Sequence, residues 1–217
     1  MAYFPMFVDL KGKKVIVIGG GKVAYRKITK LLPFEAEITV IAPDICSEIQ
    51  ELLNNNSNLI LKNRIFETED IKNAFLVISA TNNSSTNQQV AHICKSQNIP
   101  INSVDDIENC TFLFPALIKK ESLVIGCSTS GKAPDIAAFV KNTIEQDLPE
   151  NIGQVIEILG ILREELKHKV TTQKIRAQII HNLLEYCQAK DFKISYNELQ
   201  EVMQSLIIKV NESQLIK

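Results

Sequence analysis

The sequence predicts an α/β fold: a Rossmann-type parallel sheet domain, then a small α+β region and a helical C-terminal domain. Three observations predict it. Short β-branched runs alternate with helical patterns as far as Val104, a hairpin pattern follows Phe112, and beyond Ile152 only helical periodicity remains. Strands joined by helical crossovers pair in parallel and carry helices on both faces of the sheet. We therefore divide the 217 residues into domains at 1–111, 112–147 and 148–217.

The first half alternates strands and helices of the lengths expected in a Rossmann-type domain. Its strands are apolar and β-branched, which is typical of parallel strands buried on both faces. We place them at residues 15–18, 38–41, 59–61, 74–79 and 99–104. Apolar residues at helical spacing, ended by Pro33 in the first case, indicate helices at residues 22–32, 45–53 and 86–96.

The pattern changes after Asp105. Two apolar runs separated by a polar tetrapeptide predict a hairpin, with strands at residues 112–118 and 123–127, and a helix follows at residues 133–146. The last part has three amphipathic helical patterns, whose apolar faces lie within residues 155–166, 175–184 and 199–207. We expect the hairpin and the helix after it to need a partner surface.

The composition indicates a soluble globular protein. Hydrophobic residues make up 45% and charged residues 23%, with a net charge of −1, so neither a disordered chain nor a nucleic-acid-binding surface is expected. No segment resembles a signal peptide or has the roughly 18 consecutive apolar residues of a membrane span. The five cysteines form no C-x-x-C pair and the three histidines lack ligand spacing, so we expect free thiols in the cytoplasm and assign no metal site.

A glycine-rich turn joins the first strand to the first helix. Gly19-Gly20-Gly21-Lys22-Val23-Ala24 fits the pattern G-x-G-x-x-A. The first glycine of this pattern permits a tight turn, the second lets a pyrophosphate approach the backbone, and the alanine lets the helix lie close to the strand. Free N–H groups at the helix start favour the phosphates. We interpret the turn as a dinucleotide site; a tight turn without a ligand is the alternative.

The end of the second strand bears on which dinucleotide binds. It reads Ile41-Ala42-Pro43-Asp44, and an acidic residue in this region binds the ribose 2′-hydroxyl of NAD. Asp44 lies slightly late in the sequence, and its alternative role is a turn or a helix N-cap. No arginine stands beside it to bind a 2′-phosphate, so NAD is favoured over NADP.

An ordered set of motifs continues beyond the glycine turn. They are Gly19–Lys27, Thr39–Pro43, Ala80–Asn82 with Asn87-Gln88, Asn102–Asp106, Phe114–Ala116, Ser128–Pro134, Leu148-Pro149 and Gly153–Val155. In order and spacing, over about residues 5–167, they resemble the precorrin-2 dehydrogenase and sirohydrochlorin ferrochelatase family, the N-terminal module of siroheme synthase. The chain departs from that pattern at Glu35, where a glycine usually precedes Ala36, and at Ser130, where a second glycine is common.

The resemblance implies a homodimer in which a Rossmann domain is followed by a dimerisation region, here residues 112–147, and a helical domain. It implies NAD as cofactor and oxidation of precorrin-2 to sirohydrochlorin; some members also insert ferrous iron. The family's key acid corresponds to Asp105. Its cofactor contacts correspond to the glycine turn with Lys22 and Val23, to Pro43 and Asp44, and to Thr81 and Asn82.

Asp105 also stands out from the residues alone, because it ends the fifth expected strand, at the sheet edge where ligands bind. A carboxylate there could accept a proton as hydride leaves the substrate, ligate a metal ion, or cap a turn, a role that Asp106 could fill. A tetrapyrrole rich in carboxylates requires a basic cleft. We assign Ser128 and Lys132 to substrate binding, and further candidate cations are Lys119, Lys120, Arg163 and Lys167.

Three hypotheses of function follow. The first is an NAD-dependent precorrin-2 dehydrogenase, and the second is an enzyme that also acts as a sirohydrochlorin ferrochelatase. The third is a non-enzymatic Rossmann protein that senses NAD through its helical tail. A sensor would require neither the carboxylate of Asp105 nor a basic cleft, so substitution of Asp105 separates it from the enzymes.

Overall fold

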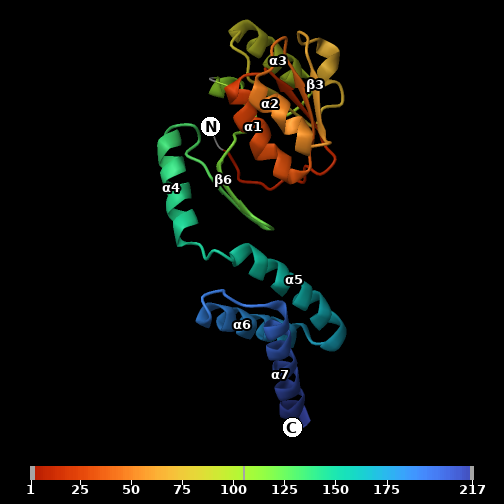
Figure 1. The fold of residues 1–217 in the computed structure, drawn as a ribbon, viewed down its shortest axis with the longest axis vertical. Coiled ribbons are helices and arrows are strands. Elements are labelled where there is room, and N and C mark those ends of the chain that lie inside the picture. Colours follow the sequence, from red (N-terminus) through yellow and green to blue (C-terminus); the bar gives the residue numbers. More distant parts are fainter. Residues whose placement is uncertain (1–2, 105, 216–217) are drawn as a thin grey trace. The chain divides into compact units, whose positions relative to one another are not determined.

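A five-stranded parallel sheet forms the centre of the first part of the chain (Figure 1). The computed structural model describes residues 3–104 and 106–215. Neighbouring strands follow the order β3-β2-β1-β4-β5. Their bounds are Lys14–Ile18 for β1, Glu37–Ile41 for β2, Leu59–Lys62 for β3, Leu76–Ser79 for β4 and Ile101–Ser103 for β5. The order reverses between β1 and β4, where such sheets bind ligands. The predicted Rossmann-type fold is confirmed.

Helices cover both faces of the sheet because its strands present apolar side chains alternately to each face. Val15 and Val17 belong to the core beneath α1 (Lys22–Leu31) and α2 (Ser47–Leu52). The intervening isoleucines of β1 belong to the opposite core, which α3 (Ser84–Ser96) covers. The continuous apolar run of β1, which predicted a central strand, therefore contributes side chains to a core on each face of the sheet.

The helix expected at residues 45–53 begins later, at Ser47. Ile45 is buried in the sheet core, and Cys46 is still extended before the helix starts. The apolar pattern placed Ile45 correctly inside the protein but assigned it to the wrong element.

The hairpin strand expected at residues 112–118 also begins later, at Ala116. Phe112 and Phe114 instead pack against the core of the parallel sheet, with their ring centroids 5.5 Å apart. An apolar pattern reports that a side chain is buried, but it does not say in which core.

The chain divides into two compact units. The first extends to Pro115 and includes Ser128–Ala133, and the second comprises Ala116–Cys127 and the chain from Pro134 onward. The second unit starts with β6 (Ala116–Lys120) and β7 (Leu123–Cys127), which pair antiparallel and confirm the predicted hairpin. The three-domain division at residues 111 and 147 stays a prediction.

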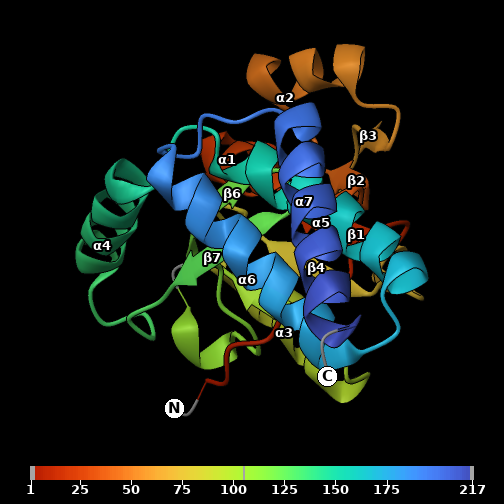
Figure 2. The same cartoon turned by 90° about the horizontal axis from the view of Figure 1, so that it is seen from below.

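The rest of the second unit is helical, as predicted. Its helices are α4 (Pro134–Asp147), α5 (Ile152–Lys169), α6 (Gln173–Ala189) and α7 (Tyr196–Leu215). The last three contact one another around an apolar core that includes Leu162, Leu183 and Leu199 (Figure 2). None of the helices within residues 3–104 and 106–215 is long and apolar enough to cross a membrane.

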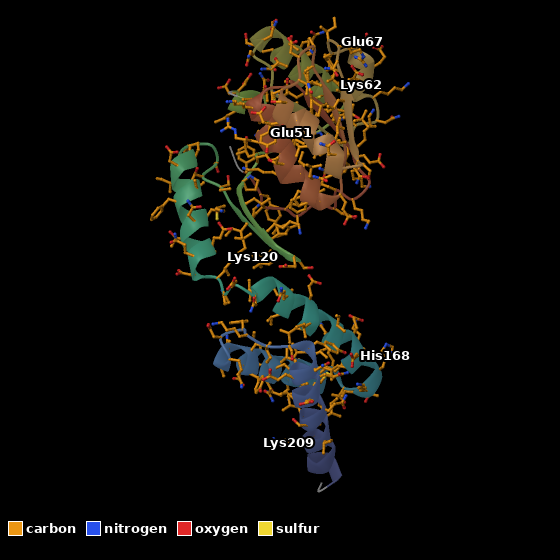
Figure 3. The ribbon with its side chains drawn as sticks, in the orientation of Figure 1. Glu51, Lys62, Glu67, Lys120, His168 and Lys209 are labelled. Atoms are coloured by element: carbon orange, nitrogen blue, oxygen red, sulfur yellow. The ribbon has the colours of Figure 1, made fainter. Side chains whose placement is uncertain are left out.

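The tip of the hairpin packs on the first turns of α5 within this unit. A Cβ atom at Gly153 would lie 3.0 Å from the carbonyl oxygen of Lys120, which Figure 3 labels. The N–H of Ser122 donates to Oε1 of Glu157 at 3.1 Å. The absence of a side chain at Gly153 thus allows the hairpin tip to lie against the start of α5.

A buried carboxylate stabilises the connection between β3 and β4, a segment to which the sequence pattern assigned no element. Asp70 lies in a 3₁₀ turn (Thr68–Ile71) and accepts two hydrogen bonds from Arg64 and one from the N–H of Glu67. Lys62 Nζ lies 3.6 Å from its Oδ1, and Figure 3 labels Lys62 and Glu67 in this region. The guanidinium of Arg64 is the main cause that lowers the pKa of Asp70 to about 2.

Asp70→Asn should flatten the acid limb of the stability profile. The folded-state pKa lies below the ordinary 3.8, so the carboxylate stabilises the fold above about pH 4, and this stabilisation is lost as the pH falls toward 2. In urea unfolding, the wild type should lose about 1 kcal/mol between pH 6 and pH 3 that the variant does not lose. Glu69→Gln, an exposed neighbour, should keep the wild-type loss. Identical profiles for wild type and Asp70→Asn would contradict this account.

Candidate functional site

The glycine turn after β1 lies directly against the ends of its two neighbouring strands. Gly19 has φ +120°, and a Cβ atom there would lie 2.2 Å from the carbonyl oxygen of Ala80. A Cβ atom at Gly20 would lie 2.2 Å from the carbonyl oxygen of Asp44. At Gly21, by contrast, a Cβ atom would have no atom within 4 Å. The first two glycines are therefore required by the fold, and the third leaves open space in front of the turn.

The open space lies at the start of α1. Gly21 is the N-cap residue, with extended backbone and no side-chain cap, and the N–H of Tyr25 bonds back to its carbonyl oxygen. The N–H groups of a helix's first turn have no partner within the helix. Lys22 is exposed beside them and Val23 is half-buried. These residues can hold a pyrophosphate through backbone N–H groups, the helix dipole and one cation.

The loop after β2 is attached to the glycine turn by two backbone hydrogen bonds. The N–H of Gly19 donates to Ile41, and the N–H of Cys46 donates to Gly20, each at 2.9 Å. Pro43 and Asp44 are exposed in this loop. The helix-capping alternative for Asp44 is wrong, because α2 begins at Ser47 with Cys46 as its N-cap. The turn alternative stays open, and the exposed Asp44 lies in the loop attached to the glycine turn.

The loop after β4 is shaped by a buried asparagine that the sequence analysis did not assign. Asn87 is 7% exposed. Its Oδ1 accepts from the hydroxyls of Ser79 and Thr81, both at 2.7 Å, and its Nδ2 donates to the carbonyl oxygen of Thr81 at 3.0 Å. Thr81 is thereby fixed beside the glycine turn, while Asn82 is exposed. A polar residue on the apolar face of α3 was the available signal.

Asp105, the predicted catalytic acid, lies outside the described residues. Its neighbours define the edge of the sheet: Ser103 is buried, and the N–H of Val104 donates to the carbonyl oxygen of Ser79. Asp106 caps a 3₁₀ turn (Ile107–Asn109), with Oδ1 accepting from the N–H of Asn109 at 3.2 Å. The sequence allowed either Asp105 or Asp106 to cap a turn, and in the structure Asp106 caps it.

The predicted substrate loop lies against the turn that follows Asp106. A Cβ atom at Gly131 would lie 2.6 Å from Cδ1 of Ile107, so the two segments touch. They line an open hollow, formed by Ile107, Thr129, Ser130, Gly131 and Lys132. Ser128 is exposed, and its hydroxyl oxygen accepts from the N–H of Ser130 at 3.1 Å. Lys132 is exposed at the rim.

Both departures from the family pattern fall where the backbone is left-handed. Glu35 has φ +55° and Ser130 has φ +54°. Glycine adopts this conformation without a steric penalty, which explains the family's preference for it at these positions.

The remaining candidate cations lie in the second unit and are not placed relative to this site. Lys167 there forms an ion pair with Glu164 at 2.7 Å. Within the described part of the chain, no three His, Cys, Asp or Glu side chains are grouped to hold a metal ion. The first unit thus brings together the predicted cofactor residues at the glycine turn, and Ser128 and Lys132 near the end of β5.

A family model described as "Putative NAD(P)-binding" matches residues 6–116, which is half of the chain. The chain belongs to this family of NAD(P)-binding domains. A solved structure named SirC, precorrin-2 dehydrogenase, superposes with a TM-score of 0.71 at 27% identity, over 94% of this chain and 98% of that one. The resemblance predicted from the motifs is confirmed at the level of the family.

Longer proteins named siroheme synthase are also similar. That of Ruthia magnifica subsp. Calyptogena magnifica is 34% identical over 213 residues, 98% of this chain and 44% of that protein. That of Neisseria meningitidis serogroup B is 39% identical over 170 residues, 78% of this chain and 35% of that protein. The chain thus spans less than half the length of these curated relatives.

Gly21→Asp should abolish NAD binding while the protein stays folded. The side chain would enter open space but would bring a negative charge to the phosphate-binding N–H groups. Calorimetry should detect no NAD binding by the variant, with a wild-type circular dichroism spectrum. Gly20→Ala is the steric control: its methyl group meets backbone, so it should lower the melting temperature, whereas Gly21→Ala should not. Unchanged NAD affinity in folded Gly21→Asp would remove the turn from the binding site.

Proposed function

We propose that this protein catalyses the NAD-dependent oxidation of precorrin-2 to sirohydrochlorin. The observation that carries the proposal is the order of groups along the carboxyl edge of the sheet. The loop with Asp44 follows β2, the glycine turn follows β1, the Thr81 loop follows β4, and the hollow adjoins the end of β5. A dinucleotide lies across such an edge at the switch point, which leaves the β5 end for the substrate.

The cofactor residues fit NAD. The open space at Gly21 admits a pyrophosphate, and the exposed carboxylate of Asp44 can accept hydrogen bonds from an unphosphorylated ribose but would repel a 2′-phosphate. When bound, NAD supplies the hydride acceptor. The loop positioned by Asn87 follows β4, on the β5 side of the glycine turn, and it would orient the nicotinamide half toward the hollow.

The oxidation removes a hydride and a proton from the reduced macrocycle. The bound NAD would accept the hydride, and the carboxylate of Asp105 would accept the proton and pass it to water. Asp106 is already hydrogen-bonded as a turn cap, which leaves Asp105 as the acid for this role. At the hollow, Lys132 and the hydroxyl of Ser128 would bind substrate carboxylates through charge-assisted hydrogen bonds. The five free thiols fit the reducing cytoplasm.

We further propose a homodimer that forms through the second unit. Ile136, Phe139 and Val140 lie on one face of α4 and are 57%, 70% and 39% exposed. Within the described residues β6 pairs only with β7, so both strands of the hairpin are edge strands. A second copy of this chain covers both features with a matching apolar surface, as closed two-fold dimers do.

Asp105→Asn should slow NADH formation from precorrin-2 by about 10²-fold, the scale of general acid–base catalysis, because the amide cannot accept the proton. NAD affinity by calorimetry should not change. Asp106→Asn is the neighbouring control and should keep most of the turnover. Single-turnover absorbance of NADH measures both. Equal rates for wild type and Asp105→Asn would show that the carboxylate is not the proton acceptor, and a wild type that binds NAD without reducing it would favour the sensor hypothesis.

Phe139→Asp should convert the dimer to a monomer, because the interface would bury an unpaired charge. Light scattering at micromolar concentration measures the mass of the wild type and the variant. Asn142→Asp adds the same charge at another exposed position of α4 and should leave the dimer intact. A monomeric wild type, or a Phe139→Asp protein that dimerises normally, would contradict the proposal.

A further inference from the structure

A lysine on α1 reaches across to the end of β5. Lys27 is half-buried, and its Nζ donates to Oδ1 of Asn102 at 2.8 Å. The same ammonium lies 4.2 Å from the ring centroid of Phe114, which is cation–π range. A surface lysine normally extends its charge into water. Here the charge is directed instead at an amide and an aromatic ring of the first unit.

Asn102 also forms a hydrogen bond with the chain that follows β5. It is 5% exposed, and its Nδ2 donates to the carbonyl oxygen of Phe112 at 3.1 Å. Lys27 and the backbone at Phe112 therefore hold opposite ends of one amide group. The hydrogen bond from Asn102 to Phe112 joins the two ends of the intervening segment to each other.

The thiol of Cys110 contacts the backbone at the end of β5 and at Asp106. Its Sγ accepts from the N–H of Ser103 at 3.2 Å and lies 3.1 Å and 3.3 Å from the carbonyl oxygens of Ser103 and Asp106. Burial raises the pKa of this thiol, so it stays protonated and can donate. Lys27, Asn102 and Cys110 thus connect α1, β5 and the chain that follows β5.

We propose that Lys27 is a positioning residue that fixes the segment carrying Asp105 relative to the cofactor turn. Gly21 of the glycine turn is the N-cap of α1, and Lys27 lies on the same helix. One element therefore sets the location of the bound phosphates and, through Asn102, that of the segment after β5. A misplacement of about 1 Å between reacting groups can slow a reaction about 10²-fold. This inference rests on the proposed function for its kinetic consequence, but not for its structural one.

The structural consequence is tested without substrate or NAD. In Lys27→Met, which keeps the apolar stem but loses the donor and the charge, amide hydrogen exchange in residues 104–112 should become about tenfold faster. Exchange in the glycine turn should not change. Lys30→Met is the matched control, an exposed lysine on the same helix, and should show wild-type exchange throughout. Wild-type protection of residues 104–112 in Lys27→Met would overturn the proposal.

The kinetic consequence separates positioning from binding. With precorrin-2 and NAD, Lys27→Met should lower kcat about tenfold or more with little change in KM, the pattern of an interaction that matters in the transition state. Lys27→Arg, which can still donate to Asn102 and stack on Phe114, should restore most of the rate. If the wild type forms no NADH, the proposed function fails, and the exchange experiment still decides the role of Lys27. A wild-type kcat in Lys27→Met would overturn that role.

If Lys27→Met does not fold, a second substitution of Lys27 tests the proposal. Lys27→Gln removes the charge but keeps a polar side chain, and it replaces Lys27→Met if circular dichroism shows that the latter is unfolded. The expected results are the same: faster exchange in residues 104–112 and a lower kcat. Wild-type values of both in Lys27→Gln would overturn the proposal.

Discussion

The close approach of backbone to backbone at Gly19 and Gly20 is the constraint on which the rest of the site depends. Any side chain at these positions would collide with carbonyl oxygens at the ends of β4 and β2. Because neither position has one, three strand ends meet at a single point of the sheet edge, and the loops with Asp44 and Thr81 flank the start of α1. The residues predicted to bind the cofactor lie near one another for this steric reason.

Helix α1 connects the glycine turn to the sheet core and to β5. Its first turn offers unpaired N–H groups, its buried face packs on the sheet through Ala24 and Ile28, and Lys27 reaches β5. Two buried amides, Asn87 and Asn102, then fix the loops after β4 and β5. A buried amide is stable only when its donors and acceptor are satisfied, so the two asparagines constrain the backbone that they contact, at Thr81 and at Phe112. The site is thus held by buried polar groups on elements that an apolar core makes rigid.

The sequence predicted what depends on local pattern and left out what depends on contacts between distant residues. The strands of the parallel sheet and the hairpin were found because burial on both faces and a short polar turn leave a local signature. Phe112 and Phe114 were assigned to the wrong element because their apolar character does not identify the core that they join. The role of Lys27 depends on Asn102, which lies 75 residues away in the sequence, and no local pattern reveals such a contact.

The two left-handed residues show how one conformational rule has different consequences at different places. Glu35 lies in the turn between α1 and β2, where its carbonyl oxygen accepts from Gly12 and its carboxylate pairs with Lys11 on the surface. A side chain there affects stability alone, by about 1 kcal/mol. Ser130 adopts the same conformation at the rim of the hollow. In place of glycine it adds a hydroxyl to the surface that would face an acidic substrate. The same backbone conformation therefore occurs outside the lining of the hollow at Glu35 and within it at Ser130.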